Sequence, residues 1–165
     1  MDDGQSSWSD YVRGMVFEGW DGTWEEVRAL DARSAELIER FERVCHPYRD
    51  QAIPVNDFVH GDLNVGNLIV ADGIIAAVID IEAASGGTRA YDLVALAASA
   101  ARNGAPAAVD EFFFDAALRA GGRASAAICA AAGYAGIAAF VARIGPSPVS
   151  RVQLGAERLL HLLER

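Results

Sequence analysis

Apolar residues recur at helical spacing near both ends of the chain and at the spacing of strands in its middle. Helical periodicity covers 7–20 and 23–45, and Thr23 with Glu26 has the spacing of a capping box that opens the second helix. Residues 46–56, which include two prolines, indicate a loop. We therefore expect two N-terminal helices that end at this loop.

Strand-like runs then occupy the β insert, residues 57–85. The apolar runs 68–70 and 74–79 are joined by Asp72 and Gly73, a turn pair typical of a β-hairpin. Helical periodicity returns after the insert and is interrupted at positions rich in Gly and Pro. It predicts four helices, over 89–102, 107–120, 124–143 and 149–163. The pattern predicts a mostly helical α+β fold that forms one domain over 1–165.

The composition supports a folded domain and limits its partners. The chain has 165 residues, of which 52% are hydrophobic, and its 23 acidic against 14 basic side chains give a net charge of −9. All 14 basic residues are arginines, so the chain contains no lysine. An acidic chain repels phosphate backbones, so we expect no nucleic-acid partner and an attraction for cationic small molecules.

One uncharged run, residues 124–142, is long enough to cross a bilayer. Because it consists mostly of alanine, its insertion energy would be marginal, and we interpret it as a packed helix, without a membrane partner. Residues 1–9 contain no apolar segment of the kind found in secretory signals. Two widely separated cysteines, Cys45 and Cys129, fit a reducing compartment, so we expect a cytoplasmic location.

Polar residues of the β insert are concentrated just before the first strand of the hairpin and just after the second. Asp62 and Asn67 precede the first strand, and Asp80 and Glu82 follow the second. A hairpin returns the end of its second strand to the beginning of its first, so we expect Asp80 to approach Asn67 and Asp62. Carboxylate and amide oxygens suit a hard cation such as Mg²⁺ and leave one carboxylate free to act as a base.

Three strings in this order resemble the aminoglycoside phosphotransferase family of small-molecule kinases, which share the protein-kinase-like fold. They are HGDLNVGN at 60–67, VIDIE at 78–82 and AYDL at 90–93. An Asp followed five residues later by an Asn has the spacing of the catalytic loop of that fold, and the later Asp corresponds to its metal-binding aspartate. The resemblance covers the C-terminal lobe of the fold, with the β insert carrying the catalytic and metal loops.

The resemblance implies an ATP- and Mg²⁺-dependent transfer of a phosphoryl group to a hydroxyl of a small molecule. Asp62 would orient the substrate hydroxyl and accept its proton. Asn67 and Asp80 would hold Mg²⁺ against the phosphates of ATP, and Glu82 would assist a second metal ion. Read without the family, Asn67 is a turn residue and Glu82 a solvated charge.

Two further residues receive structural roles from the resemblance. His60 would fix the loop rather than carry protons, and Asp92 would hold the backbone of the catalytic loop from the start of the next helix. Read alone, Asp92 is an acidic residue near a helix N-terminus, which also gives it no catalytic role.

The chain departs from the family pattern in two places. Gly87, Thr88 and Arg89 stand where the family has Gly-Asp-Pro before Tyr-Asp-Leu, and we expect Thr88 to cap the following helix. The family's N-terminal lobe supplies a glycine-rich strand pair and a lysine. The 59 residues before His60 instead predict helices, and there is no lysine. We therefore expect an N-terminal lobe to be absent, the isolated chain to have little activity, and a separate lobe or a second copy to be its protein partner.

Other functions remain open. The chain could be a non-catalytic small-molecule or nucleotide-binding module derived from such a kinase. A two-metal phosphoesterase would need more His and carboxylate ligands, and a glycosidase would leave the Asn and Gly spacing unexplained. The substrate is also open: Asp110, Glu111 and Asp115 suit an aminoglycoside-like polycation, whereas the apolar run 112–114 suits a macrolide or the core.

Overall fold

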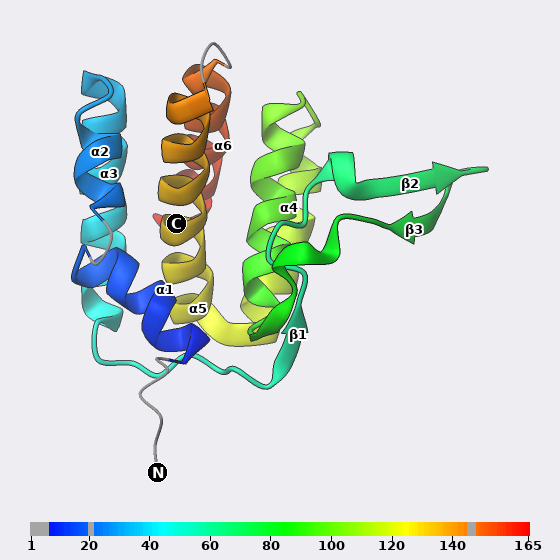
Figure 1. Cartoon of the computed structure of the whole chain (residues 1–165), viewed down its shortest axis with the longest axis horizontal. Coiled ribbons are helices and arrows are strands. Elements are labelled where there is room, and N and C mark those ends of the chain that lie inside the picture. Colours follow the sequence, from blue (N-terminus) through cyan, green and yellow to red (C-terminus); the bar gives the residue numbers. More distant parts are fainter. Residues whose placement is uncertain (1–6, 20–21, 145–147) are drawn as a thin grey trace.

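Six α-helices make up most of the described chain and pack beside two small antiparallel sheets (Figure 1). The computed structural model describes residues 7–19, 22–144 and 148–165. The helices are α1 (Trp8–Phe17), α2 (Thr23–Arg28), α3 (Ala32–Cys45), α4 (Ala90–Arg102), α5 (Ala107–Ile144) and α6 (Val149–Leu163). The predicted α+β, mostly helical class is confirmed.

The N-terminal region contains three helices where the periodicity predicts two. Its first helix has a capping box, in which the Ser7 hydroxyl accepts from the Asp10 backbone and the Asp10 carboxylate accepts from the Ser7 backbone. The predicted helix over 23–45 is divided because the Asp31 carboxylate accepts from the backbone N–H of Ser34 at 2.7 Å and opens α3.

The capping box predicted for Thr23 and Glu26 is wrong. Thr23 is the first residue of α2, and the N-cap is Gly22, whose φ of 70° lies in the left-handed region. A glycine adopts this conformation without the steric cost that a Cβ would add. The predicted end of the first helix, near Trp20, lies outside the described residues, and α1 itself ends at Phe17.

The second half of α5 is the centre of the core. The backbone turns at Gly122 (φ 74°), at the predicted break between two helices, and residues 124–132 beyond it are all buried. By length and composition α5 could cross a membrane, but 72% of its most apolar window is buried inside the molecule, as in a core helix. Small side chains let α4, α5 and α6 approach closely: a Cβ on Gly155 of α6 would lie 2.8 Å from the Ala98 carbonyl oxygen of α4.

The β insert forms two separate two-stranded sheets. Strand β1 (Asp57–Val59) pairs with β4 (Ser85–Gly87), and β2 (Leu68–Ala71) pairs with β3 (Ile74–Val78). The second pair is the predicted hairpin, and its turn residues Asp72 (φ 52°) and Gly73 (φ 76°) both have the positive φ of a type I′ turn. The prediction of a hairpin with a D-G turn is therefore confirmed.

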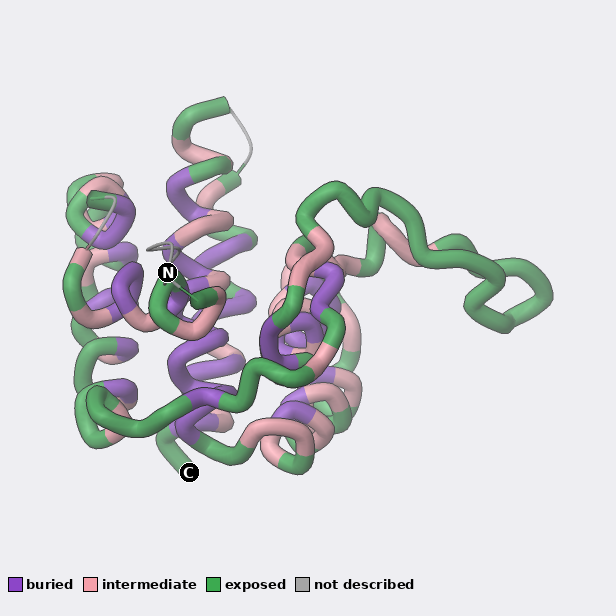
Figure 2. Tube along the Cα trace, turned by 60° about the horizontal axis from the view of Figure 1, so that its bottom comes forward, coloured by how far each residue is buried: buried purple, intermediate pink, exposed green. Residues whose placement is uncertain are grey.

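This hairpin projects away from the helices, as both views show (Figures 1 and 2). Every residue of β3 is exposed, and large apolar side chains are exposed on both strands and just beyond them. They are Ile69, Val70, Ile74, Ile75, Val78, Ile79 and Ile81. A two-stranded ribbon is marginally stable by itself in water, so this one has an apolar surface without a partner among the described residues.

Candidate functional site

Asp92, near the N-terminus of α4, fixes the start of the predicted catalytic loop, residues 60–67. Its carboxylate accepts the backbone N–H groups of His60 at 2.7 Å and of Gly61 at 3.1 Å. Asp92 is buried, and this burial raises the pKa of its carboxyl, while the two backbone hydrogen bonds lower it. The carboxylate thus provides acceptors for two backbone donors that the loop cannot satisfy itself.

The buried ring of His60 joins the catalytic loop to the end of β3. Its Nδ1 accepts from the Asp62 backbone N–H at 3.3 Å, and its Nε2 lies 2.9 Å from the carbonyl oxygen of Ile79. A ring that accepts at Nδ1 donates from Nε2, so both contacts are satisfied by one neutral tautomer. With both nitrogens engaged, His60 is placed to hold the loop.

Within the loop, side chains close a compact turn around Asp62. The amide nitrogen of Asn67 donates to the Asp62 carbonyl oxygen at 2.9 Å, and that of Asn64 donates to the same oxygen at 3.2 Å. The Asn64 side-chain oxygen caps a 3-10 turn over Val65–Asn67 by accepting from Gly66. The Asp62 carboxylate remains exposed, with the Asn64 amide nitrogen 3.4 Å from it.

The hairpin brings the second acidic segment to this loop. The backbone N–H of Ile79 donates to the Asn67 carbonyl oxygen at 3.0 Å, so Asp80 follows directly on the residue that pairs with Asn67. Asp80 has a φ of 64°, in the left-handed region, and opens the 3-10 turn Ile81–Ala83, which contains Glu82. The turn lies against the catalytic loop, because a Cβ on Gly61 would lie only 2.4 Å from the Ala83 carbonyl oxygen.

The donors present fit a divalent cation that binds through oxygen. Since the Asn67 amide nitrogen is engaged, its amide oxygen is available. The exposed carboxylates of Asp80 and Glu82 make no hydrogen bond or ion pair with a described residue. Among those residues no group of three or more His, Cys, Asp or Glu side chains could hold a metal. Two carboxylates and an amide form the small set of protein ligands that Mg²⁺ takes when water and phosphate complete its shell.

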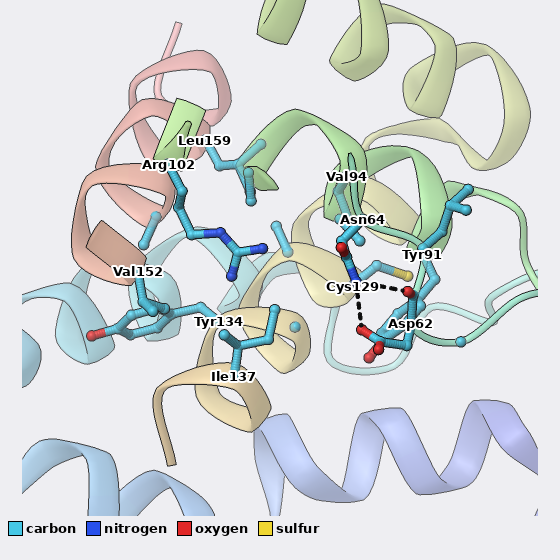
Figure 3. Close-up of a pocket in the computed structure, with 17 residues that line it drawn as sticks. Asp62, Asn64, Tyr91, Val94, Arg102, Cys129, Tyr134, Ile137, Val152 and Leu159 are labelled. Carbon is cyan, nitrogen blue, oxygen red and sulfur yellow. Dashed lines mark hydrogen bonds between the residues drawn. The ribbon is translucent and has the colours of Figure 1, made fainter. Parts of the chain in front are cut away.

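A cavity opens beside Asp62, between the catalytic loop and helices α4, α5 and α6 (Figure 3). The cavity volume is about 60 Å³, and the empty space that includes its open mouth is about 590 Å³. Seventeen described residues line it, and only Asp62 and Arg102 among them are charged. Most of the wall is apolar, and burial raises the pKa of both Cys129 and Tyr91, the latter to about 12.

Two positions at this site were not singled out from the sequence. Arg102, at the end of α4, extends its guanidinium into the cavity, although an arginine near a helix C-terminus is usually a solvated charge (Figure 3). Ser99, buried on the same helix, accepts from the backbone N–H of Val65 and so positions the catalytic loop. The one signal for Ser99 is a lone hydroxyl within a run of alanines.

The acidic residues considered for a polycation do not line this cavity. The described lining contains neither Asp110, Glu111 nor Asp115. Asp110 is buried and ion-paired with Arg158, and its burial raises the pKa of its carboxyl. Glu111 pairs with Arg165 at 3.1 Å. Of the three phenylalanines, Phe114 is buried in the core, Phe113 packs partly against it and Phe112 is exposed.

The departure from the family pattern before α4 is compensated by an ion pair. Arg89 directly precedes the first residue of α4 and makes no side-chain cap, whereas the Thr88 hydroxyl accepts from the backbone N–H of Ala90 at 3.4 Å, which confirms Thr88 as the side chain that caps this helix. The Arg89 guanidinium donates twice to one carboxylate oxygen of Asp57, at 2.6 and 3.0 Å, and its backbone N–H donates to the other oxygen. These bonds lower the pKa of the Asp57 carboxyl and tie β1 to the start of α4.

Comparison with known proteins agrees with the motifs in the catalytic loop. The chain has no match among the curated proteins or the solved structures compared with it. A family model, described as the phosphotransferase enzyme family (APH), matches residues 12–129. This match covers well over half of the chain, from α1 through the catalytic loop and hairpin into the core of α5. The protein therefore belongs to the APH phosphotransferase family.

Proposed function

We propose that this chain is the substrate- and metal-binding part of a small-molecule kinase. The observation that carries the proposal is the place of Asp62: its carboxylate lies at the edge of a cavity, in a loop fixed by Asn67 and Asp92. A small hydroxylated molecule in the cavity would present its hydroxyl to this carboxylate. Positioning of this kind accounts for much of catalysis in phosphoryl transfer.

In the proposed reaction, the substrate oxygen attacks the γ-phosphorus of ATP. A bond forms between that oxygen and phosphorus, the bond to the bridging oxygen of ADP breaks, and the hydroxyl proton passes to Asp62. Asn67, Asp80 and Glu82 would hold Mg²⁺, which supplies neutralisation of charge on the phosphate oxygens. His60 and Asp92 keep the loop in position by the hydrogen bonds described above.

We further propose that a nucleotide-binding lobe covers the projecting hairpin. The exposed apolar residues of β2 and β3 lie on the segment that joins the catalytic loop to Asp80, and the chain contains no lysine to pair with ATP phosphates. A lobe that packs there would bury the hairpin and supply that cation. Sedimentation and the binding of an apolar dye test this proposal. A monomer that binds the dye, and binds it less after I75T or I81T, supports a missing lobe. A concentration-dependent dimer would instead indicate that a second copy covers the hairpin.

The kinase proposal is tested by joining the full chain to the N-terminal lobe of a family kinase and following ADP formation with hydroxylated acceptors. Asp62→Asn should reduce turnover by about 10²-fold or more, because it removes the proton acceptor. Asp115→Asn is the matched control, since Asp115 is an exposed aspartate on α5 that does not line the cavity, and it should keep full turnover.

Calorimetry with Mg²⁺ and ATP on the chain alone tests the proposed metal ligands, and ADP formation by the joined protein separates the two classes of function. Measurable affinity that Asp80→Asn removes and Asp115→Asn keeps supports Asp80 as a ligand. If the joined protein binds no nucleotide and makes no ADP with any acceptor, the chain is a non-catalytic binding module and the kinase proposal fails.

A further inference from the structure

The charge of the cavity differs from that of the chain as a whole. The chain carries a net charge of −9, and seven of its arginines form ion pairs with carboxylates in the described structure. Arg102 forms no hydrogen bond or ion pair with any described residue, although acidic side chains are in excess. Arg102 is half-buried in a mostly apolar cavity and has no hydrogen-bonding partner there, so an anion beside its guanidinium would offset the solvation that the charge has lost.

The position of Arg102 is fixed by the packing of α4 on α6. Its side-chain stem lies in the crossing of these helices, where a Cβ on Gly155 would lie 3.2 Å from the Arg102 Cγ. From there the guanidinium reaches into the cavity, on the far side of it from Asp62 (Figure 3). Burial lowers the pKa of Arg102, and the nearby Asp62 carboxylate opposes this effect.

An adjoining groove is positively charged, whereas the two charged residues of the described cavity lining, Asp62 and Arg102, have opposite signs. It shares Asn64, Arg102 and Val152 with the cavity, and the charged residues among its described lining are Arg102 and Arg151. Like Arg102, Arg151 makes no ion pair with a described residue. A cationic substrate that approached through this groove would meet two arginines there and a single carboxylate in the cavity.

We propose that the substrate is a small hydroxy acid: a short aliphatic alcohol whose carboxylate or other acidic group binds the guanidinium of Arg102 while its hydroxyl faces Asp62. This assignment rests on the proposed kinase function for the role of the hydroxyl. The cavity volume of about 60 Å³ suits a small molecule, and the apolar wall, which includes Val94, Ile137 and Leu159, suits a short hydrocarbon. The guanidinium offers a planar pair of donors to an acidic group.

The test is a binding titration of the full chain that is monitored by NMR in the absence of nucleotide and Mg²⁺. The probes are 4-hydroxybutanoate, 1-butanol and 4-aminobutan-1-ol, which share a four-carbon alcohol and differ in charge. We expect the hydroxy acid to bind about tenfold or more tightly than the other two and to shift the Arg102 side-chain N–H resonance. Equal or tighter binding of the amino alcohol, or no binding of the hydroxy acid, overturns the proposal.

Variants locate the effect at Arg102. Arg102→Gln should weaken binding of the hydroxy acid about tenfold, and Arg102→Lys should retain part of it. Arg119→Gln is the control, because Arg119 is exposed on α5 and does not line the cavity. Unchanged affinity in the Arg102→Gln variant overturns the proposal, and the comparison of the three probes on the unmodified chain decides it even if that variant fails to fold.

These outcomes separate the substrate class from the kinase function. A chain that binds the hydroxy acid through Arg102 but never transfers phosphate retains the cavity assignment and loses the kinase. A joined protein that phosphorylates the amino alcohol in preference to the hydroxy acid retains the kinase and loses the substrate class.

Discussion

The side-chain amide of Asn67 donates a hydrogen bond to the backbone carbonyl oxygen of Asp62 at 2.9 Å. The nitrogen end of the amide therefore holds the catalytic loop closed, and the oxygen end is left for another ligand. The loop hydrogen bond and the proposed metal contact thus use different atoms of one residue, and a pair of substitutions can distinguish them.

Asn67→Ala removes both the loop hydrogen bond and the amide oxygen, whereas Asn67→Asp removes only the donor. Each variant should lose about 1 kcal/mol of stability to denaturant, because each loses the bond to Asp62. Mn²⁺, a paramagnetic substitute for Mg²⁺, should bind Asn67→Asp at least as tightly as it binds the unmodified chain. It should bind Asn67→Ala more weakly than the unmodified chain. NMR line broadening measures this, and equal Mn²⁺ affinity in Asn67→Ala would exclude Asn67 as a ligand.

Asp92→Ala should be the most destabilising substitution of a polar residue at the site. It leaves two backbone N–H groups, of His60 and Gly61, without their acceptor, and a loss of about 2 kcal/mol or more in the free energy of unfolding follows. Asp92→Asn keeps one acceptor oxygen and should lose less. The exposed Asp115, changed to Ala, should alter stability by no more than about 0.5 kcal/mol. Equal effects of Asp92→Ala and Asp115→Ala would contradict the role of Asp92 as the loop's anchor.

The free energy of unfolding should depend on pH through the carboxyl of Asp92. Burial raises the pKa of this carboxyl above its ordinary value of 3.8, so the folded state holds the proton more tightly than the unfolded state. As the pH rises from below 3.8 through the raised pKa, the unfolded state releases its proton first, and the unmodified chain loses stability relative to Asp92→Asn. Denaturant unfolding of both proteins across this range measures the difference, and a gain in relative stability would contradict the sign.

The sequence predicts those parts of the fold that local signals determine. Asp72 and Gly73 favour a type I′ turn without any contact to distant residues. The hairpin that this turn closes returns the end of β3 to Asn67. The division between α2 and α3 is missed because apolar spacing continues through Leu30, while the side chain that interrupts it, Asp31, is held by Ser34 and by Gln153 of a distant helix. Local periodicity contains no information about that tertiary contact.

The cavity likewise contains a residue, Arg102, whose place in the site cannot be predicted from local sequence. Asp62 and Asn67 are recognisable because Asn67 follows Asp62 by five positions, but Arg102 comes into the cavity through the crossing of α4 and α6 at Gly155. A glycine in a helix, 53 positions away, gives no sequence signal that it makes room for an arginine stem. The positive charge in the cavity therefore follows from tertiary packing, and an acidic composition does not predict it.

Two glycines with similar φ angles give the sharpest test of how closely the catalytic loop and the acidic 3-10 turn, Ile81–Ala83, pack. Gly61 (φ 83°) and Gly73 (φ 76°) both lie in the left-handed region, where a Cβ costs about 1–2 kcal/mol. At Gly73 a Cβ would meet no atom within 4 Å, whereas at Gly61 it would lie 2.4 Å from the Ala83 carbonyl oxygen.

Gly73→Ala should therefore reduce the free energy of unfolding only by the cost of the strained backbone. Gly61→Ala should lose about 1–3 kcal/mol more, because the 3-10 turn must move away from the loop to make room. Since that movement separates Asp80 and Glu82 from Asn67, the third proposed ligand, Gly61→Ala should also weaken Mn²⁺ binding, which Gly73→Ala should leave intact. Denaturant unfolding and NMR titration on the same two proteins measure both effects. Equal losses in the two variants would show that the catalytic loop and the acidic turn do not depend on close contact for their arrangement.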